Sequence, residues 1–244
     1  MNIVITQSMF FPWVGLLEQI RLADVIVHYD DVQFSKGSFV NRVQLKTSRG
    51  MRWMTVPLKK FSLGTEIKNI ETSRHHDWQK AHLDLMGESF SGSPFSQDAI
   101  ELVQSCYQDG NISNIGHLAR ISMYGLLDYF NLIGNKEFID VTDLNISGSS
   151  SLRVFDIVKM LGGTTYITGH GAASYLNHSL FEENGINVEY MNYQCKHYPQ
   201  NHGDFTPYVS SLDLIANMGA NGIDVICSGT KNWKDFIDER NREI

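Results

Sequence analysis

Hydrophobic and polar positions alternate along the chain with two periods, one typical of strands and one typical of helices. Residues 3–6 are a short apolar run, residues 12–23 repeat apolar positions at helical spacing, and residues 24–31 are a second apolar run that ends in two acids. Pro12 suits the first turn of the intervening helix. This order predicts a β-α-β unit, which normally belongs to a parallel sheet with a right-handed crossover.

The pattern changes to strict alternation after residue 39. Val40, Arg42, Gln44 and Lys46 fall on one face, and the residues between them, which include Val43, fall on the other. Residues 48–50 predict a turn and residues 52–58 a returning strand, so a β-hairpin is expected over about 39–58.

Helical spacing dominates from about residue 76 to 134, with one helix around Trp78 and another from about 115 to 130. Strands are predicted at 138–141, 164–168 and 188–192, and helices after Ser149 or Ser150, at 172–176, at 210–218 and at 231–240. No linker or repeat interrupts this order. We therefore predict one α/β domain over residues 1–244, a Rossmann-like, mostly parallel sheet with an inserted β-hairpin and helical segment.

Composition narrows the class of protein. The chain has 244 residues, 42% of them hydrophobic, and a formal net charge of −7, which excludes disorder as the main state and disfavours a non-specific grip on nucleic acid. Cys106, Cys195 and Cys227 show no paired spacing, which is typical of a reducing compartment. No basic, apolar leader and no long apolar span is present. A cytoplasmic protein without membrane insertion is expected.

In an open parallel sheet, ligands bind outside the carboxyl ends of the strands. That rule nominates four loops that follow predicted strands or precede helices. They are residues 7–13, 30–42, 147–153 and 169–175. All four are rich in polar residues and glycine, which predicts small-molecule chemistry at this edge.

The densest polar cluster follows the second strand. Asp30 and Asp31 alternate sides on an extended backbone, so one of them is expected to face the site, where it could hold Mg²⁺, an amine or a ribose hydroxyl. Lys36 and Arg42 could bind phosphate or carboxylate. The competing interpretation is a solvated loop with ordinary surface ion pairs.

Two other segments carry candidate groups. Gly169-His170-Gly171 joins a strand to a helix, where backbone N–H groups can bind an anion and His170 can act as a general base or as an anion donor. The alternative is a loop histidine without a partner. Tyr198-Pro199-Gln200 suggests a wall for a flat group, or an ordinary loop over the core.

Metal-ligand spacing is weak throughout. His75-His76 and the pair His197 and His202 have no acidic partner at a ligand spacing. No metal site is predicted.

Four ordered blocks resemble the WbqC-like family of bacterial proteins, often encoded with enzymes of surface-polysaccharide and nucleotide-sugar synthesis. The blocks are Gln7–Gly15, Asp30–Lys36 with Asn41-Arg42, Tyr166–Gly169 with Tyr175-Leu176, and Tyr198–Gln200 with Ser211–Asp213 and Asn217. They span nearly the whole chain, which makes the resemblance more specific than any one motif. Gly37 departs from it, because a larger and often basic residue is expected there.

The family is usually described as a glycine transferase or sugar-modifying acyltransferase. The resemblance therefore implies an amide formed between an amino acid, such as glycine, or another acyl group and the amine of a nucleotide-linked aminodeoxy sugar, in O-antigen (lipopolysaccharide) biosynthesis. Amide formation requires an activated donor: an ATP-derived adenylate, an aminoacyl-tRNA or a thioester. The non-enzymatic alternative is a nucleotide-sugar-binding or scaffold protein. The oligomeric state stays open.

On this hypothesis Asp30 or Asp31 orients and deprotonates the attacking amine, with His170 as the alternative base. The expected substrate contacts lie in the four blocks. They are Gln7, Pro12, Trp13, Gln33, Lys36, Asn41, Arg42, Gly169, Tyr175, Tyr198 and Gln200.

Overall fold

The structure, a computed structural model, describes residues 1–74, 77–109 and 111–242. A six-stranded sheet has the order β5-β2-β1-β6-β7-β8, with every pairing parallel except that of β8 with β7. Its strands are β1 (Asn2–Thr6), β2 (Val25–His28), β5 (Glu137–Asp140), β6 (Thr165–Thr168), β7 (Asn187–Asn192) and β8 (Gly229–Asn232). The predicted α/β class with a mostly parallel sheet is confirmed.

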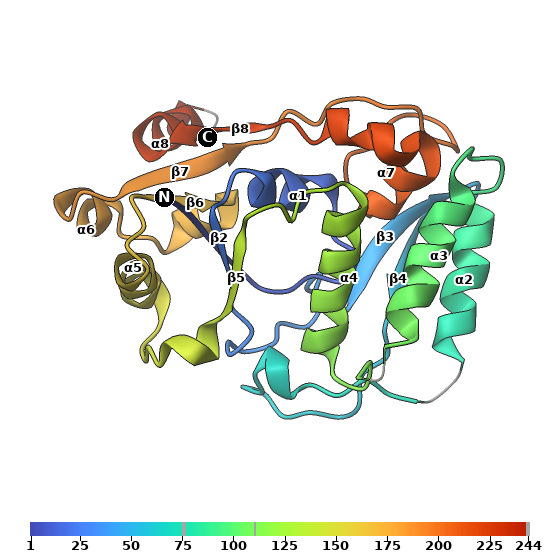
Figure 1. The fold of residues 1–244 in the computed structure, drawn as a ribbon, viewed down its shortest axis with the longest axis horizontal. Coiled ribbons are helices and arrows are strands. Elements are labelled where there is room, and N and C mark those ends of the chain that lie inside the picture. Colours follow the sequence, from blue (N-terminus) through green and yellow to red (C-terminus); the bar gives the residue numbers. More distant parts are fainter. Residues whose placement is uncertain (75–76, 110, 243–244) are drawn as a thin grey trace.

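Helices cover both faces of the sheet (Figure 1). Alternate side chains of β1 point to opposite faces, so Val4 joins one hydrophobic core while Ile3 and Ile5 join the other. The first core contains residues of α1 (Val14–Arg21) and α4 (Ile115–Tyr129). The second contains residues of α5 (Ser150–Met160) and α6 (His178–Glu183), with α8 (Trp233–Arg242) packed at its edge.

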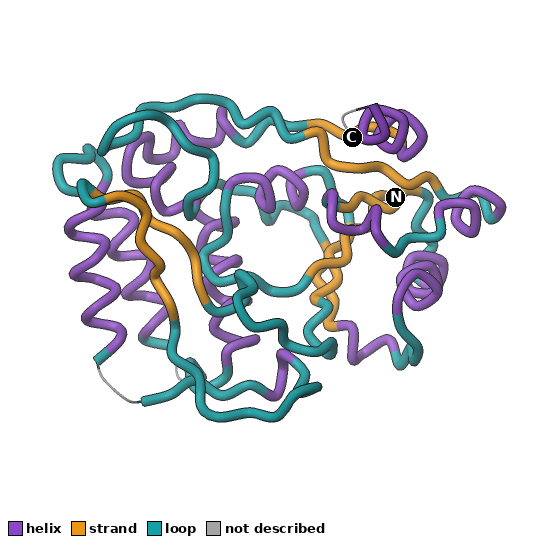
Figure 2. Tube along the Cα trace, turned by 180° about the vertical axis from the view of Figure 1, so that it is seen from behind, coloured by secondary structure: helices purple, strands orange, loops and turns teal. Residues whose placement is uncertain are grey.

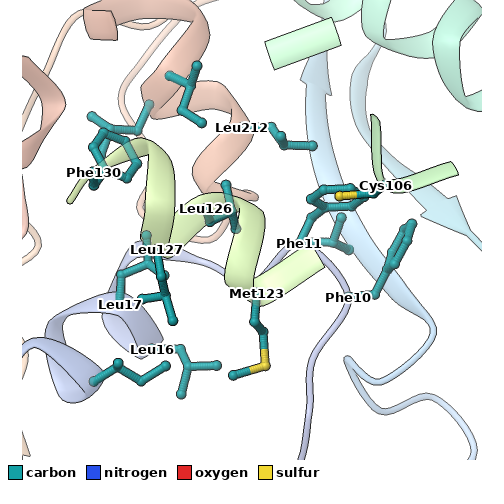
Figure 3. Packing of buried hydrophobic residues seen from close by; sticks show 14 of the residues in the cluster. Phe10, Phe11, Leu16, Leu17, Cys106, Met123, Leu126, Leu127, Phe130 and Leu212 are labelled. Atoms are coloured by element: carbon teal, nitrogen blue, oxygen red, sulfur yellow. The ribbon is translucent and has the colours of Figure 1, made fainter. Parts of the chain in front are cut away.

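The inserted hairpin, β3 (Arg42–Thr47) with β4 (Gly50–Thr55), forms a separate two-stranded sheet. The hairpin packs against α2 (Trp78–Ser89), and α2 packs against α3 (Ser96–Tyr107). Helix α7 (Ser211–Met218) contacts α3. Helix α4 joins this half of the molecule to the sheet. In Figure 3 its Met123, Leu126 and Leu127 lie between Leu16 and Leu17 of α1 on one side and the Phe10-Phe11 pair on the other.

Four elements differ from the sequence-based expectation. Residues 172–176 do not form a helix, because the small residues of His170–Ser174 make a 3-10 turn and α6 begins only after Asn177, whose side chain accepts the Leu180 N–H. Strand β8 occupies the start of the predicted helix 231–240. Its hydrogen bonds to β7 stabilise it, and its sequence shows no alternation of apolar residues that would have predicted a strand. Helix α3 lies inside the helical segment predicted over about 76–134, although no separate helix was assigned there. Helix α1 begins at Val14 because Trp13 is extended.

Over the described ranges, no helix is long and apolar enough to cross a membrane. Within the same ranges no three His, Cys, Asp or Glu side chains come together as a metal site would require. His75 and His76 lie outside the described residues.

Candidate functional site

A cleft of about 820 Å³ opens at the carboxyl edge of the parallel strands. It lies where the strand order reverses, because β2 and β6 pair with opposite sides of β1. Ligands of open α/β sheets bind at such a point, and the volume is in the range of small-molecule sites. The lining includes Thr6, Gln7, Met9, Trp13, Tyr29, Asp31, Gln33, Gly148, Ser149, Ser150, Arg153, Thr168, Gly169, Gly171, Tyr175 and Tyr193.

Asp31 and Arg153 are the charged side chains of this lining. The guanidinium donates to both carboxylate oxygens, at 2.9 Å and 2.5 Å, and its Nε donates to the Ile146 carbonyl at 3.0 Å. It also lies over the Tyr29 ring, 4.9 Å from the centroid. Bidentate pairing and stacking fix both groups in one geometry. The cleft therefore presents an orientated ion pair.

Asp30 turns away from the cleft into a buried polar network. Its Oδ1 accepts the Ser8 N–H at 2.8 Å, while Oδ2 accepts from the Ser8 hydroxyl and from Arg120, at 2.7 Å and 2.8 Å. Arg120 also donates to Asp140 at 2.8 Å. One acid of the pair lines the cleft, as expected, and it is Asp31. The expected reason was wrong, because Asp30 and Asp31 lie in a turn after the end of β2 and not on an extended backbone. Asp30 instead fixes the loop after β1.

His28 extends this network. The one proton of the Ser8 hydroxyl goes to Asp30, so Ser8 Oγ accepts from His28 Nδ1–H at 3.1 Å, and His28 Nε2 accepts from the Tyr124 hydroxyl at 2.9 Å. Burial, helped by the nearby Arg120 charge, lowers the pKa of His28 to about 4. The imidazole is neutral at pH 7, and the network holds Ser8, which is next to the cleft residues Gln7 and Met9.

An aromatic wall closes one side of the cleft. The Trp13 and Tyr193 rings lie 4.9 Å apart. Gly15 makes this position accessible to the indole, because a Cβ at residue 15 would lie 2.3 Å from the Trp13 ring. Gly169 has a similar role, since its Cβ would come within 3.3 Å of the Tyr193 hydroxyl. The absence of a side chain at these two glycines therefore leaves space for Trp13 and Tyr193 in the wall.

The tyrosines of the lining are hydrogen-bond donors at neutral pH. Burial raises the pKa of Tyr193 to about 12 and raises the pKa of Tyr29 and Tyr175 above the usual value of 10. Tyr175 is half exposed at the cleft mouth. Together with the amides of Gln7 and Gln33, these hydroxyls suit a ligand rich in hydroxyl groups.

The amino end of α5 reaches the cleft through residues 148–150. Ser149 is the N-cap, but its side chain makes no capping hydrogen bond, and Ser150 has a positive φ of 56°. Helix N-termini carry partial positive charge and free N–H groups, so anions bind there favourably. The sequence nominated this loop, although it named no residue of it as a contact.

Three expected contacts of the loop after β2 lie outside the cleft lining. Lys36 is exposed, and Asn41 is buried with its amide donating to the Val56 carbonyl at 2.9 Å. Arg42 donates to the Gly37 carbonyl at 2.7 Å and stacks over Trp53. Gly37 adopts a positive φ of 85°, so the departure from the family pattern has a backbone reason. From this loop Gln33 lines the cleft.

His170 also lies outside the cleft lining. Its Nε2 donates to the Met191 carbonyl at 2.7 Å, and its ring packs between Tyr193 and Phe236. It borders a second cavity of about 480 Å³ together with Lys231, Glu239 and Arg240. Its neighbours Gly169 and Gly171 do line the cleft.

Tyr198 and Gln200 belong to a second buried network. The Tyr198 hydroxyl donates to Asp213 at 2.8 Å, and the Gln200 amide donates to the Tyr198 oxygen at 2.9 Å. Lys46 donates to Gln200 and to the Gly203 and Asp204 carbonyls. These contacts fasten residues 198–206 to the hairpin. Pro12, also buried, uses its carbonyl to accept the Ser211 N–H at 2.9 Å.

Sequence reasoning missed three functional candidates. Arg153, Tyr29 and Tyr193 line the cleft, but none belongs to a block of unusual composition. A signal existed for Arg153, which is the one cation of the nominated segment 147–153 and lies in the first turns of α5. Tyr29 directly precedes the acid pair. Its role could not be predicted from the sequence, because it depends on the Arg153 guanidinium that stacks over its ring.

Comparison with known proteins finds a family model and a relative of similar length. The model of the WbqC-like protein family matches residues 7–225. An uncharacterized protein of Mycobacterium tuberculosis, Rv1507c, is 28% identical over 227 residues, which cover 92% of this chain and 97% of that protein. No solved structure matches the chain significantly.

Proposed function

The chain belongs to the WbqC-like protein family, and on that premise we propose that it transfers an acyl group, such as a glycyl group, to the amine of a nucleotide-linked amino sugar of surface-polysaccharide (O-antigen) synthesis. The observation that carries the proposal is the cleft at the reversal of strand order. There an aromatic wall, a helix N-terminus and an ion pair with a carboxylate lie around one space.

Each part of a nucleotide sugar has a matching surface. The rings of Trp13 and Tyr193 offer stacking faces for the base. The N–H groups of the first turn of α5, which follows the N-cap Ser149, suit the diphosphate. The Gln7 and Gln33 amides and the tyrosine hydroxyls suit the sugar.

Asp31 is the acid placed to receive a proton from the sugar's ammonium group. The neutral amine then attacks the activated carbonyl, a C–N bond forms, and the bond to the leaving group breaks with its electron pair on that group. The remaining extra proton leaves nitrogen and ends on the leaving group or in solvent. Arg153 holds the Asp31 carboxylate in one orientation. His170 lies outside the cleft lining and is the weaker candidate for the base.

Mass spectrometry tests the reaction. A dTDP-linked amino sugar is incubated with the protein and with one donor at a time: glycine and ATP, glycyl-tRNA, or a glycyl thioester. The proposal predicts a product heavier by one acyl group with at least one donor, and its loss in Asp31→Asn. Asp84→Asn is the matched control, because Asp84 pairs with Lys80 on the exposed surface of α2. No mass gain with any donor would overturn the transferase assignment.

One observation favours a non-catalytic nucleotide-sugar-binding protein as the second candidate. Both Asp31 oxygens already accept hydrogen bonds from Arg153, and the ionisable groups of the described cleft lining are otherwise tyrosines. A binding protein needs only groups that orient its ligand, and it does not need an unoccupied carboxylate that can act as a base. It predicts saturable binding of the nucleotide sugar and no product with any of the three donors.

A further inference from the structure

The positive charge of this acidic chain is concentrated in one segment. Residues 32–65 contain seven of the 20 Lys and Arg residues and no Asp or Glu, although the whole chain carries a formal charge of −7. The seven are Lys36, Arg42, Lys46, Arg49, Arg52, Lys59 and Lys60. This segment includes the whole β3–β4 hairpin, so an anionic partner would meet a locally cationic surface.

The two faces of the hairpin differ. Val43, Leu45 and Met54 are buried against the helices, whereas the opposite face is open along β4. Figure 2 shows the hairpin strands in front of the helices that cover their inner face. Trp53 and Phe39 are 40% and 47% exposed, far more than core packing of such rings would leave. The open face therefore presents large rings to a partner.

These rings carry a cation. Arg42 lies over the Trp53 ring at 4.1 Å from the centroid, and Phe39 packs against the same ring at 6.0 Å. We use the name hairpin patch for Phe39, Arg42, Met51 and Trp53. Of the cations in this segment, Arg49 and Lys59 pair with Glu88 and Glu71, whereas Lys36 and Arg42 have no ion-pair partner in the part of the chain that the structure describes.

The hairpin patch is physically joined to the cleft. The Phe39 carbonyl accepts the Phe10 N–H at 2.9 Å, and Phe10 belongs to the loop that places Met9 and Trp13 in the cleft. Within β3, the Gln44 carbonyl accepts the Ser210 N–H at 3.0 Å, and Ser210 forms a β-bridge with Trp13. Backbone hydrogen bonds therefore join the segment that carries the patch to the loop that forms the cleft wall.

We propose that the hairpin patch binds the single-stranded 3′ end of an aminoacyl-tRNA and so supplies the acyl donor, an inference that rests on the proposed function. Exposed rings stack on bases, a stacked guanidinium adds cation–π attraction, and unpaired cations neutralise phosphates. An acidic carrier protein would use the charges but not the flat rings. The RNA end uses both.

The transfer balances without a further reagent. The ammonium group of the sugar gives one proton to solvent by way of Asp31. Its neutral amine attacks the ester carbonyl of the aminoacyl-tRNA, the C–N bond forms and the ester C–O bond breaks. The second proton leaves nitrogen and ends on the ribose hydroxyl that departs. The ester is the activated group, so no nucleotide hydrolysis accompanies this step.

Fluorescence anisotropy of a labelled single-stranded RNA that ends in CCA tests the binding. The wild-type chain should bind, with an affinity that falls as salt rises. Trp53→Ala and Arg42→Gln should each weaken binding about tenfold, the loss expected for one stacked base or one charge-assisted contact. Lys80→Gln is the matched control, since it removes one exposed cation of α2 and should leave the affinity unchanged.

Transfer assays separate this inference from the proposed function. With glycyl-tRNA as donor, Trp53→Ala should lose about tenfold in rate at limiting donor, while binding of the nucleotide sugar stays at the wild-type level. Absence of RNA binding, an equal loss in Lys80→Gln, or preference for an acidic carrier protein or an anionic vesicle would overturn the inference. If product then still forms from a thioester or from glycine and ATP, the proposed function stands and the tRNA donor alone fails.

Discussion

Arg153 of helix α5 and Asp31 of the loop after β2, 122 residues apart in the chain, meet through two hydrogen bonds at the cleft. Their side chains are only 8% and 13% exposed, so the pair is largely desolvated. The contact fixes the loop against the helix N-terminus. It joins the carboxylate expected to act on the amine to the helix expected to hold the phosphates.

Removing one partner of this pair should be costly. Asp31→Ala leaves the Arg153 guanidinium buried without its carboxylate, and we expect the free energy of unfolding to fall by about 3 kcal/mol. Urea denaturation measures it. The double variant Asp31→Ala with Arg153→Met should recover part of the loss, because the unpaired charge is then gone. A loss below about 1 kcal/mol in the single variant would show that solvent already screens the pair.

Gly15 should control nucleotide binding through Trp13. In Gly15→Ala the new Cβ would lie 2.3 Å from the indole, which must leave the cleft wall. We expect a weaker affinity for the nucleotide sugar, by about tenfold or more for the lost stacking, and a stability loss of about 1–3 kcal/mol from overpacking. Gly87→Ala is the control, since no atom lies within 4 Å of a Cβ there. Equal affinities in the two variants would contradict the role of Trp13.

Stability should fall on mild acidification. Burial lowers the pKa of His28 and of His82 to about 4, so the unfolded chain takes up these protons near pH 6.5 and the folded chain only near pH 4. The free energy of unfolding that comes from keeping these two histidines neutral is fully present above pH 6.5 and is lost as the pH falls towards 4. We expect roughly 2 kcal/mol per histidine by about pH 5. Denaturation curves across this window measure the slope, which His28→Gln should reduce by about half.

Lys46 should hold the 198–206 segment. Its amine donates to Gln200 and to two backbone carbonyls, and its charge lowers the pKa of Asp213, which burial raises. Lys46→Met should therefore raise the pKa of Asp213 further and cost about 1–3 kcal/mol through the unsatisfied carbonyls. Hydrogen exchange should quicken at Thr206, whose N–H donates to Gln200. Unchanged protection there would rule out this anchoring role.

The fold was predictable where the apolar pattern has a clear period. Strand β1, the strand within residues 24–31 and the hairpin all follow from alternation or from buried runs, and the carboxyl-edge rule placed Gln7, Trp13, Asp31, Gln33, Gly169 and Tyr175 in one cleft. Strand β8 could not be found because its stability comes from its partner β7.

The expected substrate contacts that lie outside the cleft were predicted wrongly for a different reason. Residue type cannot show whether a polar side chain faces a ligand or another part of the chain. Asn41 and Gln200 are polar residues of the family blocks, yet their amides fasten one segment to another. Arg42 is a cation at the end of the loop after β2, but its guanidinium is directed by Gly37 and Trp53 to the hairpin surface. Only the tertiary contacts separate these roles.

Titration calorimetry with a dTDP-linked amino sugar tests the central claim most directly. The wild-type chain should bind one sugar nucleotide saturably, while Trp13→Ala and Arg153→Gln should each weaken the affinity about tenfold or more, through lost stacking and through the released Asp31 loop. His197→Gln, on the exposed loop outside the cleft, should bind as wild type. An absence of saturable heat in the wild-type chain, or equal affinity in all variants, would contradict the cleft as the nucleotide-sugar site.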